Sequence, residues 1–188
     1  MKKSLLNVIS FTIIFSIAAS CGTSSQIYSY GNKNKTYTGQ LGDSIFLSLK
    51  KYLTINANSK LKDTIIIKYD YNNETCWNNL DQSEDENIRG FIKKYKEKIL
   101  LVLFTRQNVS IFNFREAGNS LNKIKKWDTS IIIDSSKQLF NLLFKERCTC
   151  GNSIIIMPNR KFVFVRSDSH FEVLDFSQKR IEEILSNQ

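Results

Sequence analysis

The sequence is poor in residues on which several common kinds of active site depend. Its 188 residues include one histidine, His170, and one proline, Pro158. A histidine-dependent catalytic triad would have a single candidate base, and the sequence contains neither a Gly-x-Ser-x-Gly motif nor a phosphate-binding glycine loop. These absences argue against hydrolases and nucleotide-binding enzymes.

The apolar run near the start is also too short for a membrane span. Residues 5–17 are mostly apolar, whereas a helix that crosses a bilayer needs ~20 such residues. Lys2 and Lys3 precede the run and small residues follow it at 18–20, a pattern typical of a secretion signal. We therefore exclude residues 1–20 from the predicted fold.

Cys21 directly follows the small residues, and this start resembles the signal of bacterial lipoproteins. That signal usually has Leu where this chain has Ala18. The resemblance implies acyl chains, palmitate among them, on Cys21, and several chains on one residue hold a protein stably at a membrane. Gly22 stands where Asp is associated with retention at the inner membrane, so we expect a periplasmic protein anchored at the outer membrane. The alternative is an ordinary secretion signal with an incidental cysteine.

The net charge is positive but dispersed. The formal charge of +9 falls to +7 without Lys2 and Lys3, and acidic residues 81–86 interrupt the basic ones. Nucleic-acid binding calls for a recognisable motif or a concentrated basic face. We expect no nucleic-acid partner and no cofactor; an envelope protein is the expected partner, and the oligomeric state stays open.

Hydrophobic patterning divides the remaining chain into a polar tether, residues 21–40, and one domain, residues 41–188. Helices are predicted from 43, after a Ser83–Glu86 capping box, near 139 and over 177–186. Strands are predicted at 64–71, 99–104 and 130–134, and as a hairpin of 153–157 and 161–165 around Pro158-Asn159. Asp43 or Ser44, and Ser135 or Ser136, are predicted helix caps.

Four predicted strands are apolar without alternation: III at 65, ILLVLF at 99, III at 131 and III at 154. Strands have this composition when helices cover both faces of their sheet. The sequence therefore predicts a three-layer α/β sandwich with a mixed central sheet, a C-terminal β-hairpin and a terminal helix.

This order of elements resembles the thioredoxin-like superfamily over residues 41–188. Cys76 follows a central strand close to a helix start, and CTCGNSIIIMPNRKFVFV, residues 148–165, matches the loop and hairpin before the last helix of that fold. The chain departs from the family at Asn79, which replaces the second cysteine of Cys-x-x-Cys. It also lacks the cis-proline before the hairpin, where Asn152-Ser153 stands.

The resemblance places Cys76 at the same end of the sheet as Cys148 and Cys150. It implies that Cys76 bonds to one of these two, because Cys148 and Cys150 are too close in sequence to bridge each other easily. An odd number of cysteines remains beside Cys21, so one thiol stays outside the bond or bonds another molecule. A zinc site of the three cysteines with His170 is the weaker alternative, so no metal is predicted.

Two functions stay open. In the first, Cys76 is the attacking thiol and Cys150, or Cys148, the resolving one in thiol-disulfide exchange with envelope proteins, since a helix start favours a thiolate. In the second, the domain is a non-catalytic binding or structural lipoprotein with a stabilising disulfide. Whether the chain is an enzyme is therefore left undecided at this point.

Overall fold

A mixed six-stranded sheet forms the centre of the molecule. The computed structural model describes residues 35–57, 60–72, 74–118 and 122–186. Within them the strands lie in the order β1-β6-β5-β2-β3-β4. The β2–β3 and β3–β4 pairs are parallel, and the β1–β6, β6–β5 and β5–β2 pairs are antiparallel. The strands are β1 (Thr36–Gln40), β2 (Thr64–Asp70), β3 (Val109–Glu116), β4 (Ile132–Asp134), β5 (Asn152–Ile156) and β6 (Lys161–Val165).

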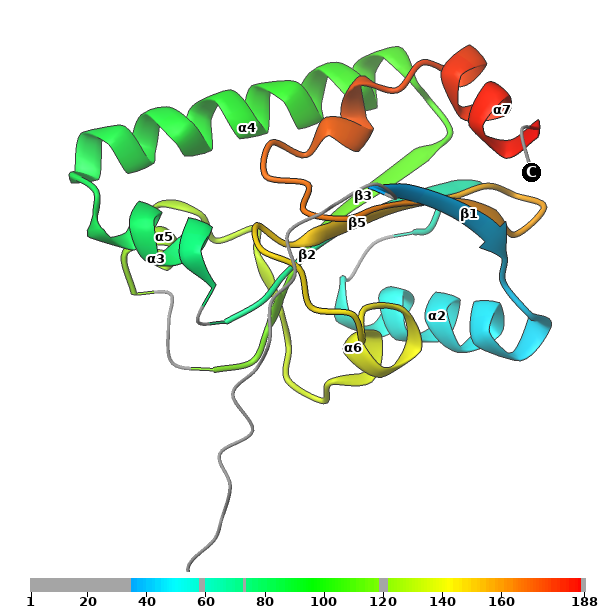
Figure 1. Cartoon of the computed structure of the whole chain (residues 1–188), viewed down its shortest axis with the longest axis horizontal. Helices are drawn as coiled ribbons and strands as arrows, with labels where there is room; N and C mark the ends of the chain where they lie inside the picture. The colour runs from blue at the N-terminus through cyan, green and yellow to red at the C-terminus, as the bar shows by residue number, and fades with distance from the viewer. Residues whose placement is uncertain (1–34, 58–59, 73, 119–121, 187–188) are drawn as a thin grey trace, which may run out of the picture.

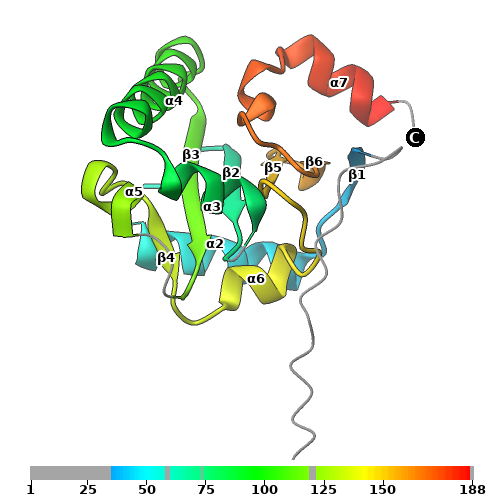
Figure 2. The ribbon, with the colours of Figure 1, turned by 60° about the vertical axis from the view of Figure 1, so that its left-hand side comes forward.

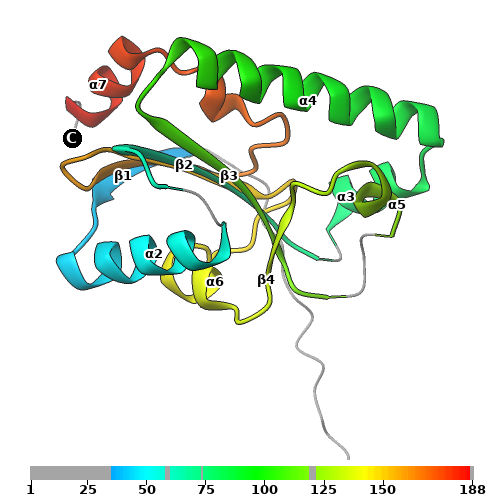
Figure 3. The ribbon, with the colours of Figure 1, turned by 180° about the vertical axis from the view of Figure 1, so that it is seen from behind.

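Helices cover both faces of this sheet. In Figures 1 and 2, α4 and α7 lie on one side of the sheet, and α2 and α6 lie on the other. The shorter α3 and α5 lie side by side beyond one end of the sheet (Figures 1 and 3). The helices are α2 (Asp43–Asn56), α3 (Thr75–Gln82), α4 (Asp85–Thr105), α5 (Asn122–Trp127), α6 (Gln138–Leu143) and α7 (Gln178–Ser186), with a 3₁₀ turn, η2, at Glu172–Asp175. The predicted α/β class with a mixed, doubly covered sheet is confirmed.

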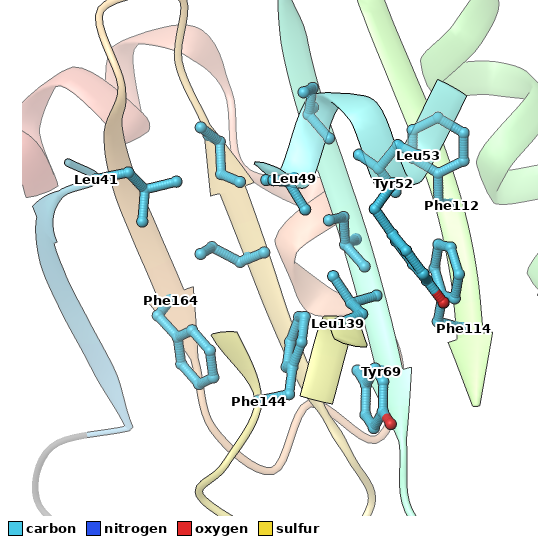
Figure 4. Packing of buried hydrophobic residues seen from close by; sticks show 14 of the residues in the cluster. Leu41, Leu49, Tyr52, Leu53, Tyr69, Phe112, Phe114, Leu139, Phe144 and Phe164 are labelled. Carbon is cyan, nitrogen blue, oxygen red and sulfur yellow. The ribbon is translucent and has the colours of Figure 1, made fainter. Parts of the chain in front are cut away.

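The alternation of side chains along β2 explains its continuous apolar sequence. Ile65 and Ile67 belong to the buried cluster that includes residues of α2 and α6. Figure 4 shows aromatic members of this cluster on β2, β3 and β6 and directly after α6. Ile66 points the other way, toward α4 and α7. Both faces of the strand therefore bury apolar surface, which contributes about 25 cal/mol per Å².

The predicted strand at residues 99–104 is wrong. ILLVLF forms the end of α4, and the strand comes later, at β3. Ile99 and Val102 continue the helical spacing of the buried stripe that begins at Ile88, so this packing overrides the strand-like composition. Beyond this stripe, Leu100, Leu101 and Phe104 are exposed.

The other predicted elements are mostly present, but some of their predicted boundaries differ from the observed ones. The hairpin around Pro158-Asn159 and the terminal helix are present. Residues 36–40, predicted as the end of the tether, form edge strand β1 and pair with β6. Residues 1–34, which hold the predicted signal and Cys21, lie outside the described residues.

The predicted side-chain caps of α2 and α4 are also wrong, whereas Ser136 Oγ does accept the backbone N–H of Gln138, the first residue of α6, at 3.4 Å. Gly42 and Glu84 occupy the N-cap positions of α2 and α4, and neither makes a side-chain cap bond. At α6 the N-cap position belongs to Lys137, while the Asp134 carboxylate accepts the backbone N–H groups of Leu139 and Phe140 at 3.3 and 2.8 Å. In the described part of the chain, no helix has the length and apolar character needed to span a membrane.

Candidate functional site

A disulfide joins Cys76 to Cys150 across 74 residues of sequence. Cys76 lies in the first turn of α3, which begins five residues after β2 ends. Cys150 lies in the loop just before β5, with its Cα 5.1 Å from that of Cys76. Both residues are half-buried, so the bond lies near the surface of the protein.

The third candidate, Cys148, is fully buried and lies outside this bond. The structure therefore brings Cys76 together with Cys150 and places Cys148 two residues away in the chain. The predicted bond to Cys76 is present, and of the two partners that the resemblance allowed, it is Cys150 that forms it. Whether any of these thiols reacts stays a prediction.

A buried carboxylate holds the backbone at both ends of the bond. Glu74 is 1% exposed, and its Oε2 accepts the backbone N–H of Cys76 at 3.0 Å and that of Cys150 at 2.7 Å. One side chain thus fixes two segments that are distant in sequence. Sequence reasoning missed Glu74, because Glu is not among the usual helix N-cap residues and its bond to Cys150 joins segments far apart in sequence.

A buried ion pair lies on the other side of Cys150. Lys68 Nζ is 2.9 Å from Asp70 Oδ1 and donates to the Cys150 carbonyl oxygen at 2.7 Å. Both charged side chains are almost fully buried. Buried charges are tolerated when they are paired in this way. Neither residue was among the sequence-predicted site residues.

The backbone after Cys150 needs glycine. Cys150 and Gly151 both have positive φ, 66° and 71°. A Cβ on residue 151 would collide with the Asp70 carboxylate, the Lys68 ammonium and the Tyr69 carbonyl oxygen. Gly151 therefore lets the loop approach β2 closely enough for Cys150 to reach Cys76.

A buried network fixes the loop between β2 and α3. The Asn72 backbone N–H donates to Glu116 Oε2 at 3.1 Å, and its side-chain amide donates to the carbonyl oxygens of Glu116 and Ala117. Arg147 binds both oxygens of the Glu116 carboxylate, and its Nη1 lies 2.7 Å from Oε2. The network joins the loop that leads to Cys76 to β3 and to the loop that carries Cys150.

The same network lowers the pKa of Glu116. Burial alone would raise that pKa, but the hydrogen bond from Arg147, the backbone N–H of Asn72 and the Arg147 charge together outweigh burial. The carboxylate form is therefore the one that the fold stabilises. Burial also lowers the pKa of the neighbouring Arg115 guanidinium, which nearby carboxylates partly offset.

A pocket of about 380 Å³ opens beside the disulfide. Its walls come from α3, α4 and α5, and its polar side includes both bonded cysteines. Its lining is Lys68, Asp70, Cys76, Asn79, Leu80, Ser83, Phe91, Ile92, Tyr95, Asn113, Ile124, Asp128, Ile131, Cys150, Ser169 and His170. The bond is thus accessible from a hollow that could receive a ligand or part of a partner.

The weaker zinc alternative can be compared with this geometry. One carboxylate oxygen of Glu74 and the sulfurs of Cys76 and Cys150 lie within 4.8 Å of one another, and this is the one such group among the described residues. His170 and Cys148 are not part of it. With the two sulfurs bonded to each other, neither is a thiolate, the form that binds a metal.

The comparison with solved structures shows a structural likeness at low sequence identity. The chain resembles the structure of MTB DsbF in its mixed oxidized and reduced forms, with 9% sequence identity and a TM-score of 0.36. The likeness covers 68% of this chain and 81% of that one. No family model matches the chain, and no curated protein matches it. What the site can do is therefore inferred from its own geometry.

Proposed function

We propose that this chain is a thioredoxin-like protein of the cell envelope that exchanges its Cys76–Cys150 disulfide with thiols of other envelope proteins. The observation that carries the proposal is the position of the bond. It joins a helix-start cysteine to a loop cysteine at the end of central strand β2, and both half-buried residues line an open pocket. A bond placed there can be reached by a second protein.

The exchange follows ordinary thiol chemistry. A partner thiolate attacks Cys76 Sγ, the Cys76–Cys150 bond breaks, and Cys150 leaves as a thiolate that takes up a proton. A second partner thiolate then attacks the partner sulfur of the mixed disulfide and releases Cys76, which is also protonated. The partner loses two electrons and two protons as it gains a disulfide, and the domain gains them as two thiols.

The sheet supports the thioredoxin-like assignment. A parallel pair, β2–β3, is followed by an antiparallel hairpin, β5–β6, and a terminal helix, with β5 beside β2. Asn79 replaces the second cysteine of the family motif, and Cys150, from the loop before β5, supplies the second sulfur instead. When the domain oxidises a partner, Cys76 is therefore the sulfur that is attacked and Cys150 the thiolate that leaves. In the reverse direction, Cys76 is the attacking thiol on a partner disulfide and Cys150 the resolving one, with Cys148 as the alternative resolving residue.

The proposed location is the periplasm, with the protein anchored at the outer membrane through a lipidated Cys21. The signal-like residues 1–20 and the position of Cys21 support it. Cys21→Ser should move the protein from the membrane fraction to the soluble periplasmic fraction after export. If the variant stays membrane-bound to the same extent as the parent, the anchor is not at Cys21.

The second candidate function is a non-catalytic binding or structural protein with a stabilising bridge. The contacts of Glu74 and Lys68 favour it, because they fix the backbone around both cysteines as a structural bridge requires. The two functions differ in the reduction potential of the bond. Exchanging disulfides have potentials between about −270 and −120 mV, whereas structural ones lie below about −300 mV.

The deciding experiment is non-reducing peptide mapping of the purified protein through a series of glutathione buffers, with thiols alkylated before and after reduction. The proposal expects the bond to open in the exchanging range while the protein stays folded. In Cys150→Ser, the free Cys76 thiolate should attack a disulfide of a partner protein, release one partner thiol and stay in a mixed disulfide, because Cys150 is no longer there to resolve it. Cys148→Ser is the matched control and should leave the Cys76–Cys150 bond intact. A bond that opens only on unfolding would establish the structural alternative.

A further inference from the structure

Three side chains form a polar row across the sheet beneath the pocket. Ser153 of β5, Lys68 of β2 and Asn113 of β3 are paired in register, one on each strand. Along β2, Lys68 lies on the same face as Ile66, the face that α4 covers. The apolar face of the sheet thus becomes polar where it reaches the pocket.

Two buried polar atoms at the pocket lack a partner. Asn113 is 7% exposed, and its Oδ1 accepts no hydrogen bond from the described residues. The Tyr95 hydroxyl, on α4, is likewise buried without a partner among them. Both residues line the pocket. A buried polar group without a hydrogen-bond partner is unfavourable, so a ligand that supplies the partner gains affinity.

The charges at the pocket are already neutralised. Lys68 is paired with Asp70, and Asp128 is paired with Lys96 at 3.1 Å. Burial raises the pKa of the Tyr95 phenol well above its ordinary value, and the negative charges of Asp70, Asp168 and Asp128 raise it further. The phenol therefore keeps its proton and can donate a hydrogen bond. A charged ligand would lose its hydration without gaining an ionic partner here.

The apolar walls define the rest of the ligand. Leu80 of α3, Phe91 and Ile92 of α4, and Ile124 and Ile131 surround the pocket. A volume of about 380 Å³ lies within the range of pockets that hold small organic molecules. Aromatic and aliphatic walls with two polar atoms fit a ring system that carries one polar end.

We propose that this pocket binds an uncharged, mainly apolar small molecule whose hydroxyl or amide groups supply a donor to Asn113 Oδ1 and an acceptor to the Tyr95 hydroxyl. The bound molecule lies against the Cys76–Cys150 disulfide and limits access to it. Binding itself does not require that the disulfide be redox-active, so this proposal is independent of the exchange function.

The test uses 2-naphthol as the probe and 2-methylnaphthalene as a probe of similar shape without the hydroxyl. Calorimetric titration of the purified protein is expected to show saturable one-to-one binding of 2-naphthol. Tyr95→Phe removes only the phenolic oxygen and should weaken 2-naphthol binding about three- to tenfold, while leaving 2-methylnaphthalene unchanged. The rate at which dithiothreitol reduces the bond should fall as 2-naphthol saturates the pocket.

A filling variant tests the place of binding. Leu80→Trp should abolish binding of both probes, whereas Leu47→Trp, on the exposed surface of α2, should leave both affinities unchanged. Absence of saturable 2-naphthol binding to the parent protein would overturn the proposal. So would equal affinity for the two probes combined with no effect of Tyr95→Phe, because the polar groups would then play no part.

Discussion

Glu74 is the residue on which the geometry of the disulfide most depends. Its carboxylate is the shared acceptor for the backbone N–H groups of Cys76 and Cys150. Without it, two donors at the bond lose a charge-assisted hydrogen bond. Hydrogen bonds to charged groups contribute about 1.5–3 kcal/mol each to stability, and more when their loss leaves a buried group unsatisfied.

Glu74→Ala should therefore lower the free energy of unfolding by about 3–6 kcal/mol, and Glu74→Gln by less, since the amide oxygen can still accept. Urea unfolding of the oxidised protein measures both. Glu86→Gln, at an exposed position of α4, serves as the control and should change stability by less than about 0.5 kcal/mol. Equal stability of Glu74→Ala and the parent would show that Glu74 does not hold the bond.

Glu116 gives the fold a defined acid sensitivity. Its folded-state pKa lies below the ordinary value of 4.5, despite the opposing effect of burial, because Arg147 and the Asn72 backbone N–H stabilise the carboxylate. A lowered pKa contributes stability that is present above the unfolded-state pKa and is lost as the pH falls through the folded-state pKa. The stability should thus decline below about pH 4.5.

Glu116→Gln should be less stable than the parent at pH 7 and show a shallower decline between pH 5 and about pH 3. Urea midpoints measured across this interval test the expectation. Glu97→Gln, which removes an exposed carboxylate of α4, is the matched control and should keep the parent's pH profile. If the stability of Glu116→Gln depended on pH in the same way as that of the parent, the role of the Arg147 network would be contradicted.

At the scale of elements, the long helix α4 distinguishes the structure most clearly from the sequence prediction. In a strand covered on both faces, neighbours Leu101 and Val102 would both be buried. In the helix, Leu101 is 62% exposed and Val102 is 5% exposed. Substitutions at these two positions therefore report directly which element residues 99–104 form.

Leu101→Gln should change the free energy of unfolding by less than about 0.5 kcal/mol, whereas Val102→Ala should lower it by about 2 kcal/mol through lost apolar burial and a small cavity. Thermal or urea unfolding of the two single variants is sufficient. Comparable losses at both positions would favour the strand instead.

The sequence predicted most elements because their patterns are local. The isoleucine runs of β2, β4 and β5 and the hairpin turn at Pro158 carry their own signals. β3 was missed because Asn113 and Arg115, polar residues buried at the site, interrupt its apolar pattern. Residues 99–104 were misassigned because apolar composition alone does not separate a strand from a buried helix end.

The candidate site was predictable only in part. The three cysteines were visible, and the resemblance brought Cys76 toward Cys150. Glu74, Lys68 and Asp70 could not be assigned, because their role depends on a contact with a loop about 80 residues away that only the fold creates. The preference for Cys150 over Cys148 likewise depends on the positive φ of residues 150 and 151.

For the whole molecule, the disulfide closes a loop that contains most of the site. A loop of 74 residues corresponds, in the chain-entropy account, to a stabilisation of about 4–5 kcal/mol, before any native strain is subtracted. The protein without the bond should fold but be markedly less stable.

The double variant Cys76→Ser with Cys150→Ser should lose about 3–4 kcal/mol in urea unfolding relative to the oxidised parent. The reduced parent should match the double variant, which separates the cross-link from the effect of serine. Cys148→Ser leaves the Cys76–Cys150 bond intact, so it serves as the control for a cysteine-to-serine change without loss of the cross-link. A double variant as stable as the parent would mean that the bond contributes no net stability.

The same closed loop gives the molecule an unusual response to mechanical tension. Pulled from its two ends, the oxidised chain transmits force from residue 76 to residue 150 through one covalent bond, and the segment between them bears no load. Edge strand β1 and the hairpin strand β6 lie on the loaded path, while β3, β4 and helices α4 to α6 lie off it. Reduction would let the segment between the cysteines, which are 74 positions apart, extend as well, and this adds roughly 260 Å to the length of the fully extended chain. The oxidation state of one bond thus sets how far the protein can extend under load.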